Sequence, residues 1–183
     1  LETALREALD QDQLQLHYQP QIDIASGHLY SVEALARWTH TRLGDVSPVC
    51  FIPLAEEAGL IGQLGLWALK EACHQLSCWR REGLVVPSIS VNLSPTNFHS
   101  PTLPAIIDQI LHDEALDASD LTLEITENVL LDADPTTLRT LRRVHALGVR
   151  LSMDDFGTGY SSLSYLRQLP ISELKLDRSF VHD

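Results

Sequence analysis

The chain has 183 residues, of which 44% are apolar, so it is long and apolar enough for one domain with a sizeable core. Thirteen basic and 25 acidic residues give a formal net charge of −12, which disfavours DNA, RNA polymers and anionic membranes as partners. No run of eighteen apolar residues occurs, so this segment is expected to make no membrane contact.

The first half of the chain predicts a helix, two strands and a second, longer helix. The spacing of apolar residues places these elements at residues 1–13, 14–24, 29–38 and 66–83. The Ser26-Gly27 pair between the two strands is typical of a turn, so the strands are expected to form a hairpin.

From Ser88 onward, predicted strands alternate with predicted helices. The strands lie at 88–93, 121–126, 149–153 and 174–176, and the helices at 103–113, at 135–148 and around Leu163, Leu166 and Leu169. This order predicts a parallel sheet with crossover helices, and the spacing suits a (β/α) barrel whose chemistry sits at the C-terminal ends of the strands. Six predicted strands fall short of the roughly eight in such a barrel, so C-terminal strands are expected to be absent from this chain.

The cysteines Cys50, Cys73 and Cys78 are odd in number and lack CxxC spacing. We therefore expect free, mostly buried thiols in a reducing compartment, which predicts a cytoplasmic protein.

Two adjacent carboxylates, Asp154 and Asp155, end an apolar run and open the glycine-rich turn Phe156–Tyr160. Neighbouring negative charges repel, so the pair predicts a cation nearby. Two hard cations that share one carboxylate can bind a reactive water between them. The alternative interpretation is an aspartate pair that caps a turn.

Three further polar residues stand on other predicted strands. Glu33, with Arg37 on the same strand face, can supply a metal ligand and a phosphate clamp, or a salt-bridged strand end. Asn92 offers an amide oxygen that adds coordination without charge, or it is a turn residue. Glu124 alternates with apolar neighbours and needs a partner, for which a metal serves.

Glu127 and Lys175 complete the set of candidates. Glu127 falls just past a predicted strand, where it holds a loop or is a solvated charge. Lys175 alternates with Leu174 and Leu176 on a strand expected to be buried. There it orients an attacking water or forms an ion pair inside the barrel.

Nearly the whole chain, residues 16–181, resembles the EAL family of cyclic-di-GMP phosphodiesterases. Seven motifs carry the resemblance, in family order along the chain: Tyr18–Pro20, Glu33–Trp38, Phe51–Glu56, Val91–Ser94, Glu124–Glu127, Asp154–Leu163 and Lys175–Asp177.

The resemblance implies an α/β fold, a modified TIM-type barrel with one antiparallel strand. It also implies hydrolysis of cyclic di-GMP to linear pGpG with two Mg²⁺ or Mn²⁺ ions. The family pattern assigns the first metal to Glu33, Asn92, Glu124 and Asp154, and the second to Asp154 and Asp155. It assigns water positioning to Lys175, the shape of the loop after Asp155 to Glu127, and substrate contacts to Gln19, Leu35 and Arg37.

Residues 1–183 are thus expected to be one EAL phosphodiesterase domain that is incomplete at its C-terminal end, because a further glutamate and a glutamine of the family pattern are absent. The segment Leu1–Leu5 resembles the helix that joins such domains to an upstream regulatory domain, here a sensor or diguanylate-cyclase-like domain; a homodimer stays open. The alternative function is a cyclic-di-GMP receptor that does not cut its ligand. The carboxylates favour the enzyme, because binding alone does not need a two-metal cluster.

Overall fold

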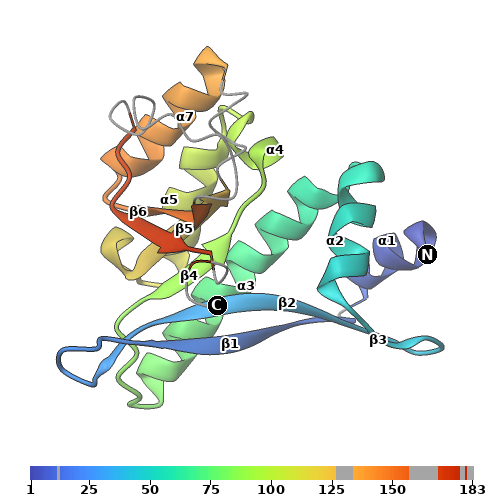
Figure 1. Ribbon diagram of the computed structural model, residues 1–183, viewed down its shortest axis with the longest axis horizontal. Helices are drawn as coiled ribbons and strands as arrows, with labels where there is room; N and C mark the ends of the chain where they lie inside the picture. The colour runs from blue at the N-terminus through green and yellow to red at the C-terminus, as the bar shows by residue number, and fades with distance from the viewer. Residues whose placement is uncertain (12, 127–133, 157–168, 178–179, 181–183) are drawn as a thin grey trace. The chain divides into compact units, whose positions relative to one another are not determined.

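The computed structural model describes residues 1–183 except 12, 127–133, 157–168, 178–179 and 181–183 (Figure 1). The chain divides into two compact units, Leu1–Val91 and Asn92–Asp183. Among the helices described, none is both long and apolar enough to cross a membrane.

The first unit is built on a long hairpin, as predicted. Strand β1 (Leu14–Ile22) pairs antiparallel with β2 (Leu29–His40), and the turn between them is closed by the Ser26 N–H, which donates to Asp23 Oδ1 at 2.7 Å. Strand β4 (Ile89–Asn92) pairs parallel with β2. A short strand that the sequence did not predict, β3 (Gly44–Val46), pairs antiparallel with the end of β2.

Three helices complete this unit: α1 (Glu2–Asp10), α2 (Pro48–Glu57) and α3 (Ile61–Arg81). Trp38 of β2 is buried and meets Phe51 of α2 edge-on, with ring centroids 6.0 Å apart. Helix α2 was not predicted, because Pro53 lies inside it and interrupts the helical pattern. Even-numbered residues of β2 such as Val32, Ala34 and Trp38 are buried, so residues 33, 35 and 37 lie on its opposite face.

In the described residues of the second unit, three strands run parallel: β5 (Leu121–Thr126), β6 (Arg150–Phe156) and β7 (Glu173–Leu176). Its helices are α4 (Pro95–Phe98), α5 (Leu103–Asp113) and α7 (Pro135–Ala146), with the short 3₁₀ helix η1 (Ala118–Asp120) before β5. The predicted α/β alternation is confirmed in these elements, and α5 packs against α7. The helix expected around Leu163 lies outside the described residues.

Two expectations about burial are wrong. Strand β7 was expected to be buried, but Leu174 is 46% and Leu176 63% exposed. The cysteines are free as predicted, yet only Cys73 is buried, since Cys78 is half-buried and Cys50 is exposed. Alternation and helical spacing show which residues share a face, but not whether another element covers that face.

Candidate active site

The three parallel strands present one polar face. Glu124 of β5 lies in register with Ser152 of β6, which lies in register with Glu173 of β7. Because side chains alternate along a strand, Asp154 and Lys175, two residues further on, point to the same face. Apolar residues such as Leu123 and Met153 occupy the other face and are fully buried. The parallel pairing therefore places the polar groups side by side.

Glu124 is at the centre of this polar face. Its side chain has no exposed surface and forms an ion pair with Lys175 Nζ, whose side chain is 18% exposed. A carboxylate oxygen of Glu124 and one of Asp154 lie within 4.8 Å of each other. Two carboxylates this close, one of them buried, repel each other unless cations compensate them. The ion pair that was predicted as one alternative for Lys175 is thus present, and it joins two predicted site residues.

Asp154 and Asp155 lie at an irregularity of β6. The register between β6 and β7 shifts between Met153 and Phe156. Met153 pairs with Leu174 and Phe156 pairs with Leu176, so β6 has one more residue than β7 between the two pairs. Asp155 has a φ of 52°, in the left-handed region, and its N–H donates to Asp154 Oδ1 at 3.0 Å. This is a β-bulge, a feature that redirects side chains next to active sites. The expected strand end at 153 is thus wrong, since β6 runs on to Phe156 through the bulge.

The hairpin of the first unit carries the other predicted residues. Gln19 of β1 lies directly opposite Glu33 of β2 in the antiparallel register. One face of β2 carries Glu33, Leu35 and Arg37, which are all half-buried. The prediction that Glu33 and Arg37 share a strand face is thus confirmed. The Arg37 guanidinium donates from Nη1 to its neighbouring backbone carbonyl, that of Ala36, at 2.8 Å.

Asn92 is the last residue of β4 and is exposed. The backbone just after it is fixed, because the Leu93 N–H donates to the carbonyl of Glu124 at 3.0 Å. Glu127, which was predicted to hold a loop, lies outside the described residues.

Ser152 and Glu173 belong to the polar face but were not predicted. Ser152 is fully buried between the register positions of Glu124 and Glu173. Ser152 lies two residues before Asp154, and Glu173 lies two residues before Lys175. Strand alternation could therefore have placed both on the same face as the predicted site residues.

Comparison with known proteins places these features in a family. A family model described as "EAL domain" matches residues 2–183. The chain is 46% identical over 181 residues to the oxygen sensor protein DosP of Escherichia coli, covering 99% of this chain and 23% of that protein. It is 45% identical over 179 residues to MucR of Pseudomonas aeruginosa, a bifunctional diguanylate cyclase/cyclic di-GMP phosphodiesterase, covering 98% of this chain and 26% of that protein.

Solved structures of related proteins also match this chain. The structure described as PaMucR phosphodiesterase in complex with c-di-GMP matches with a TM-score of 0.90 and 45% identity, over 99% of this chain and 75% of that chain. The Xanthomonas citri FimX EAL domain in complex with c-di-GMP matches with a TM-score of 0.85 and 28% identity, over 97% of this chain and 68% of that one.

The fold is therefore of the modified TIM-barrel class that EAL domains share, as predicted. The chain belongs to the EAL domain family. It spans about a quarter of the length of the curated relatives it matches.

Proposed function

We propose that this EAL domain hydrolyses a phosphodiester bond of cyclic di-GMP and releases linear pGpG. The observation that carries the proposal is the buried Glu124 carboxylate, which lies within 4.8 Å of Asp154 and in an ion pair with Lys175. The family match and the names of relatives such as MucR and the cyclic di-GMP phosphodiesterase NbdA, which is 44% identical, support the substrate and the reaction.

The donor set fits Mg²⁺ or Mn²⁺. The C-terminal halves of β5 and β6 carry three carboxylates, Glu124, Asp154 and Asp155, against the single ammonium of Lys175. This excess of negative charge favours cations, and oxygen ligands select hard ones. When bound, such ions supply Lewis-acid activation of water and of the phosphate. Glu33 and Asn92 would complete the first set of ligands, and Asp154 would be shared with a second ion also held by Asp155.

Lys175 would position the attacking water, because an ammonium held by a buried carboxylate keeps its remaining N–H donors in a fixed direction. Glu127 would hold the loop that follows Asp155. Both Lys175 and Glu127 would thus shape the site, and other residues would bind the substrate.

The substrate contacts would come from the hairpin. An anionic dinucleotide approaches a protein with a formal charge of −12, so a local cation is needed to hold its phosphate. Arg37, half-buried on the face of β2 that carries Glu33, provides a guanidinium suited to bidentate phosphate binding. Gln19, opposite Glu33, and Leu35, between Glu33 and Arg37, would contact the rest of the ligand.

We propose that the domain works in a cytoplasmic signalling protein in which a further, regulatory domain controls it. Relatives about four times as long as this chain, one of them named as a bifunctional cyclase and phosphodiesterase, support that arrangement. A homodimer is compatible with it.

A turnover assay tests the proposal against the receptor alternative. The full-length protein that contains this domain is purified and mixed with cyclic di-GMP and Mg²⁺ or Mn²⁺, products are separated by chromatography, and binding is measured by calorimetry. We expect pGpG to accumulate and EDTA to stop it. Tight binding without turnover would instead make the domain a receptor, and absence of both would contradict the family assignment of substrate.

A further inference from the structure

Helix α3 carries a thiol in contact with two nitrogen side chains. Cys78 Sγ lies 3.5 Å from His74 Nε2, one turn earlier, and accepts a hydrogen bond from Arg81 Nη2 at 3.1 Å. Residues four before and three after a given position lie on the same helix face, so the three side chains form one cluster. None of them belongs to the proposed catalytic site.

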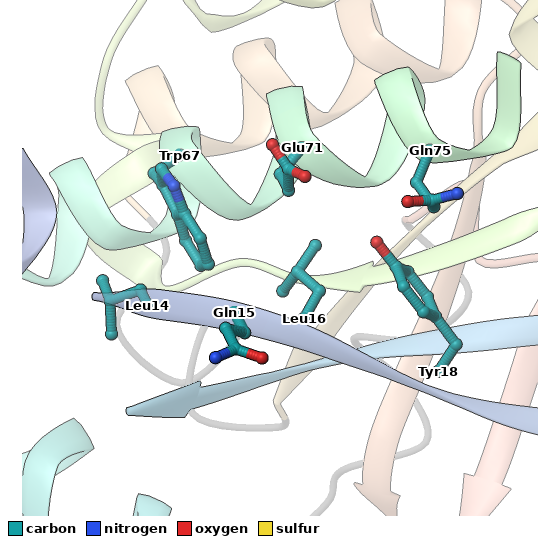
Figure 2. Close-up of a pocket in the computed structure, with 7 residues that line it drawn as sticks. All are labelled: Leu14, Gln15, Leu16, Tyr18, Trp67, Glu71 and Gln75. Carbon is teal, nitrogen blue, oxygen red and sulfur yellow. The ribbon is translucent and has the colours of Figure 1, made fainter. Parts of the chain in front are cut away.

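Glu71 and Gln75, which lie on α3 near the cluster in sequence, line a groove between β1 and α3. The groove has a volume of about 280 Å³, and Figure 2 shows Leu16 and Tyr18 of β1 pointing across it to α3, with the Tyr18 hydroxyl near Gln75. The Tyr18 ring packs edge-on against Trp79, the residue after Cys78, with centroids 4.7 Å apart. Burial, followed by the neighbouring Glu71 and Cys78, raises the pKa of Tyr18 above its ordinary value, so the phenol stays protonated.

The other two cysteines lack this environment. Cys73 is fully buried in the core of the first unit, and Cys50 is exposed on the first turn of α2. Within the described part of the chain, no hydrogen bond joins the Cys50 thiol to a cationic side chain. The chain thus holds a protected thiol, an exposed thiol, and a half-buried thiol with a guanidinium on its sulfur.

These contacts matter because the thiolate is the reactive form of cysteine. A neutral imidazole can take the thiol proton, and a guanidinium, which stays charged at physiological pH, stabilises the resulting anion through a charge-assisted hydrogen bond. Half-burial leaves Cys78 open to a small reactant.

We propose that Cys78 is a modification site, a thiol that hydroperoxides oxidise to a sulfenic acid. His74 accepts the thiol proton and Cys78 Sγ attacks one peroxide oxygen. The O–O bond breaks as the S–O bond forms, and the departing oxygen takes the proton back as water or an alcohol. Sulfur loses two electrons and the peroxide gains them, so one thiol and one hydroperoxide give one sulfenic acid and one water or alcohol.

The modified side chain is larger and more polar than the thiol, and it belongs to the residue before Trp79, whose ring contacts Tyr18. Oxidation therefore disturbs the packing of α3 on β1 close to Gln19. This gives a readout in tryptophan fluorescence that does not depend on phosphodiesterase activity.

The test measures the rates of the three cysteines in one sample of the intact protein. Hydrogen peroxide is added at neutral pH, sulfenic acid is trapped with dimedone, and labelled peptides are quantified by mass spectrometry over time. We expect Cys78 to be labelled first, ahead of the more exposed Cys50. We expect Arg81→Met to slow Cys78 labelling about three- to tenfold, the effect of removing a charged hydrogen-bond donor at a partly exposed site.

Lys70→Met is the matched control, because it removes one positive charge from an exposed position of the same helix. It should leave the rate at Cys78 within about twofold of the unmutated protein, as expected for a distant, screened charge. Faster labelling of Cys50, or an unchanged Cys78 rate in Arg81→Met, would overturn the proposal. If Arg81→Met fails to fold, the ranking of Cys78 against Cys50 in the unmutated protein still decides it.

Discussion

The two units hold the candidate site residues on strands with different neighbours, since β2 pairs antiparallel with β1 and parallel with β4, whereas β5 pairs parallel with β6. In the first unit, Gln19 and Glu33 face each other across an antiparallel hairpin, and Gln19 is exposed. In the second unit, Glu124 lies on the parallel strand β5, where every residue from Leu121 to Ile125 is buried. Antiparallel hairpins tolerate one solvated face, whereas parallel strands are usually covered on both.

We propose that this difference separates substrate binding from chemistry. A half-buried guanidinium such as Arg37 can meet a soluble anion with little cost in desolvation, since water still reaches it. A buried carboxylate such as Glu124 is stable only with compensating cations around it, and a low dielectric strengthens its interactions with them. We therefore expect substitutions of Glu124, Asp154 and Lys175 in the second unit to abolish turnover or stability, and substitution of Arg37 on the hairpin to weaken substrate affinity.

The largest effect is expected from Asp154→Asn. Asparagine keeps the shape of the side chain but removes the charge that two metal ions would share, so kcat should fall on the order of 10³-fold. The melting temperature should change by no more than a few degrees, because Asp154 is half-buried. Turnover of cyclic di-GMP and thermal melting measure the two quantities.

Asp108→Asn, on the exposed face of α5, is the control for loss of one negative charge in the same unit. It should retain full activity. An Asp154→Asn protein that hydrolyses cyclic di-GMP at the unmutated rate would remove Asp154 from the metal site.

The next effect is on stability, from Lys175→Met. The substitution removes the ammonium from the buried Glu124 carboxylate, and breaking a buried pair from one side costs about 3 kcal/mol in free energy of unfolding. Adding Glu124→Gln should recover at least half of that loss, because the double variant no longer buries a charge. Urea unfolding of the two single variants and the double variant measures the coupling. Strictly additive losses would show that the two groups stabilise the unit independently.

On the hairpin, Arg37→Ala should raise KM about tenfold with a smaller change in kcat, since a guanidinium–phosphate contact is made in both the ground state and the transition state. Arg42→Ala, at the exposed turn between β2 and β3, removes the same charge and should leave KM unchanged. Equal KM values for Arg37→Ala and the unmutated protein would mean that another group holds the phosphate.

The sequence analysis brought Glu124, Asp154 and Lys175 into one set because they stand near the C-terminal ends of predicted parallel strands, where a barrel places its chemistry. It did not predict that Lys175 contacts Glu124, because that contact depends on the register of three strands separated by helices. The bulge at Asp155 was also missed, since a non-glycine residue with positive φ leaves no pattern in the sequence. Exposure of Leu174 and Leu176 was missed because it depends on what covers them.

The smallest effect concerns Asp134, which caps α7 at the N-terminal end of the helix. Its Oδ1 accepts a hydrogen bond from the Thr137 N–H at 2.7 Å, and its Oδ2 lies 3.6 Å from His99 Nε2. The hydrogen bond, followed by the attraction of His99, holds the pKa of Asp134 below its ordinary value of 3.8. A carboxyl group whose pKa is lower in the folded state than in the unfolded state stabilises the fold at pH values above its unfolded-state pKa. This stabilisation is lost as the pH falls through the pKa of the folded state.

Asp134→Asn should therefore flatten the fall of the melting temperature between about pH 5 and pH 3, because an amide oxygen still caps the helix but does not titrate there. At pH 7 the variant should melt within about 1–3 °C of the unmutated protein, as expected for replacing one good cap by another. Asp108→Asn, which removes an equal charge from an exposed position that caps no helix, should leave the slope between pH 5 and pH 3 as it is. The same slope in Asp134→Asn and the unmutated protein would mean that the Thr137 hydrogen bond does not couple this carboxylate to folding.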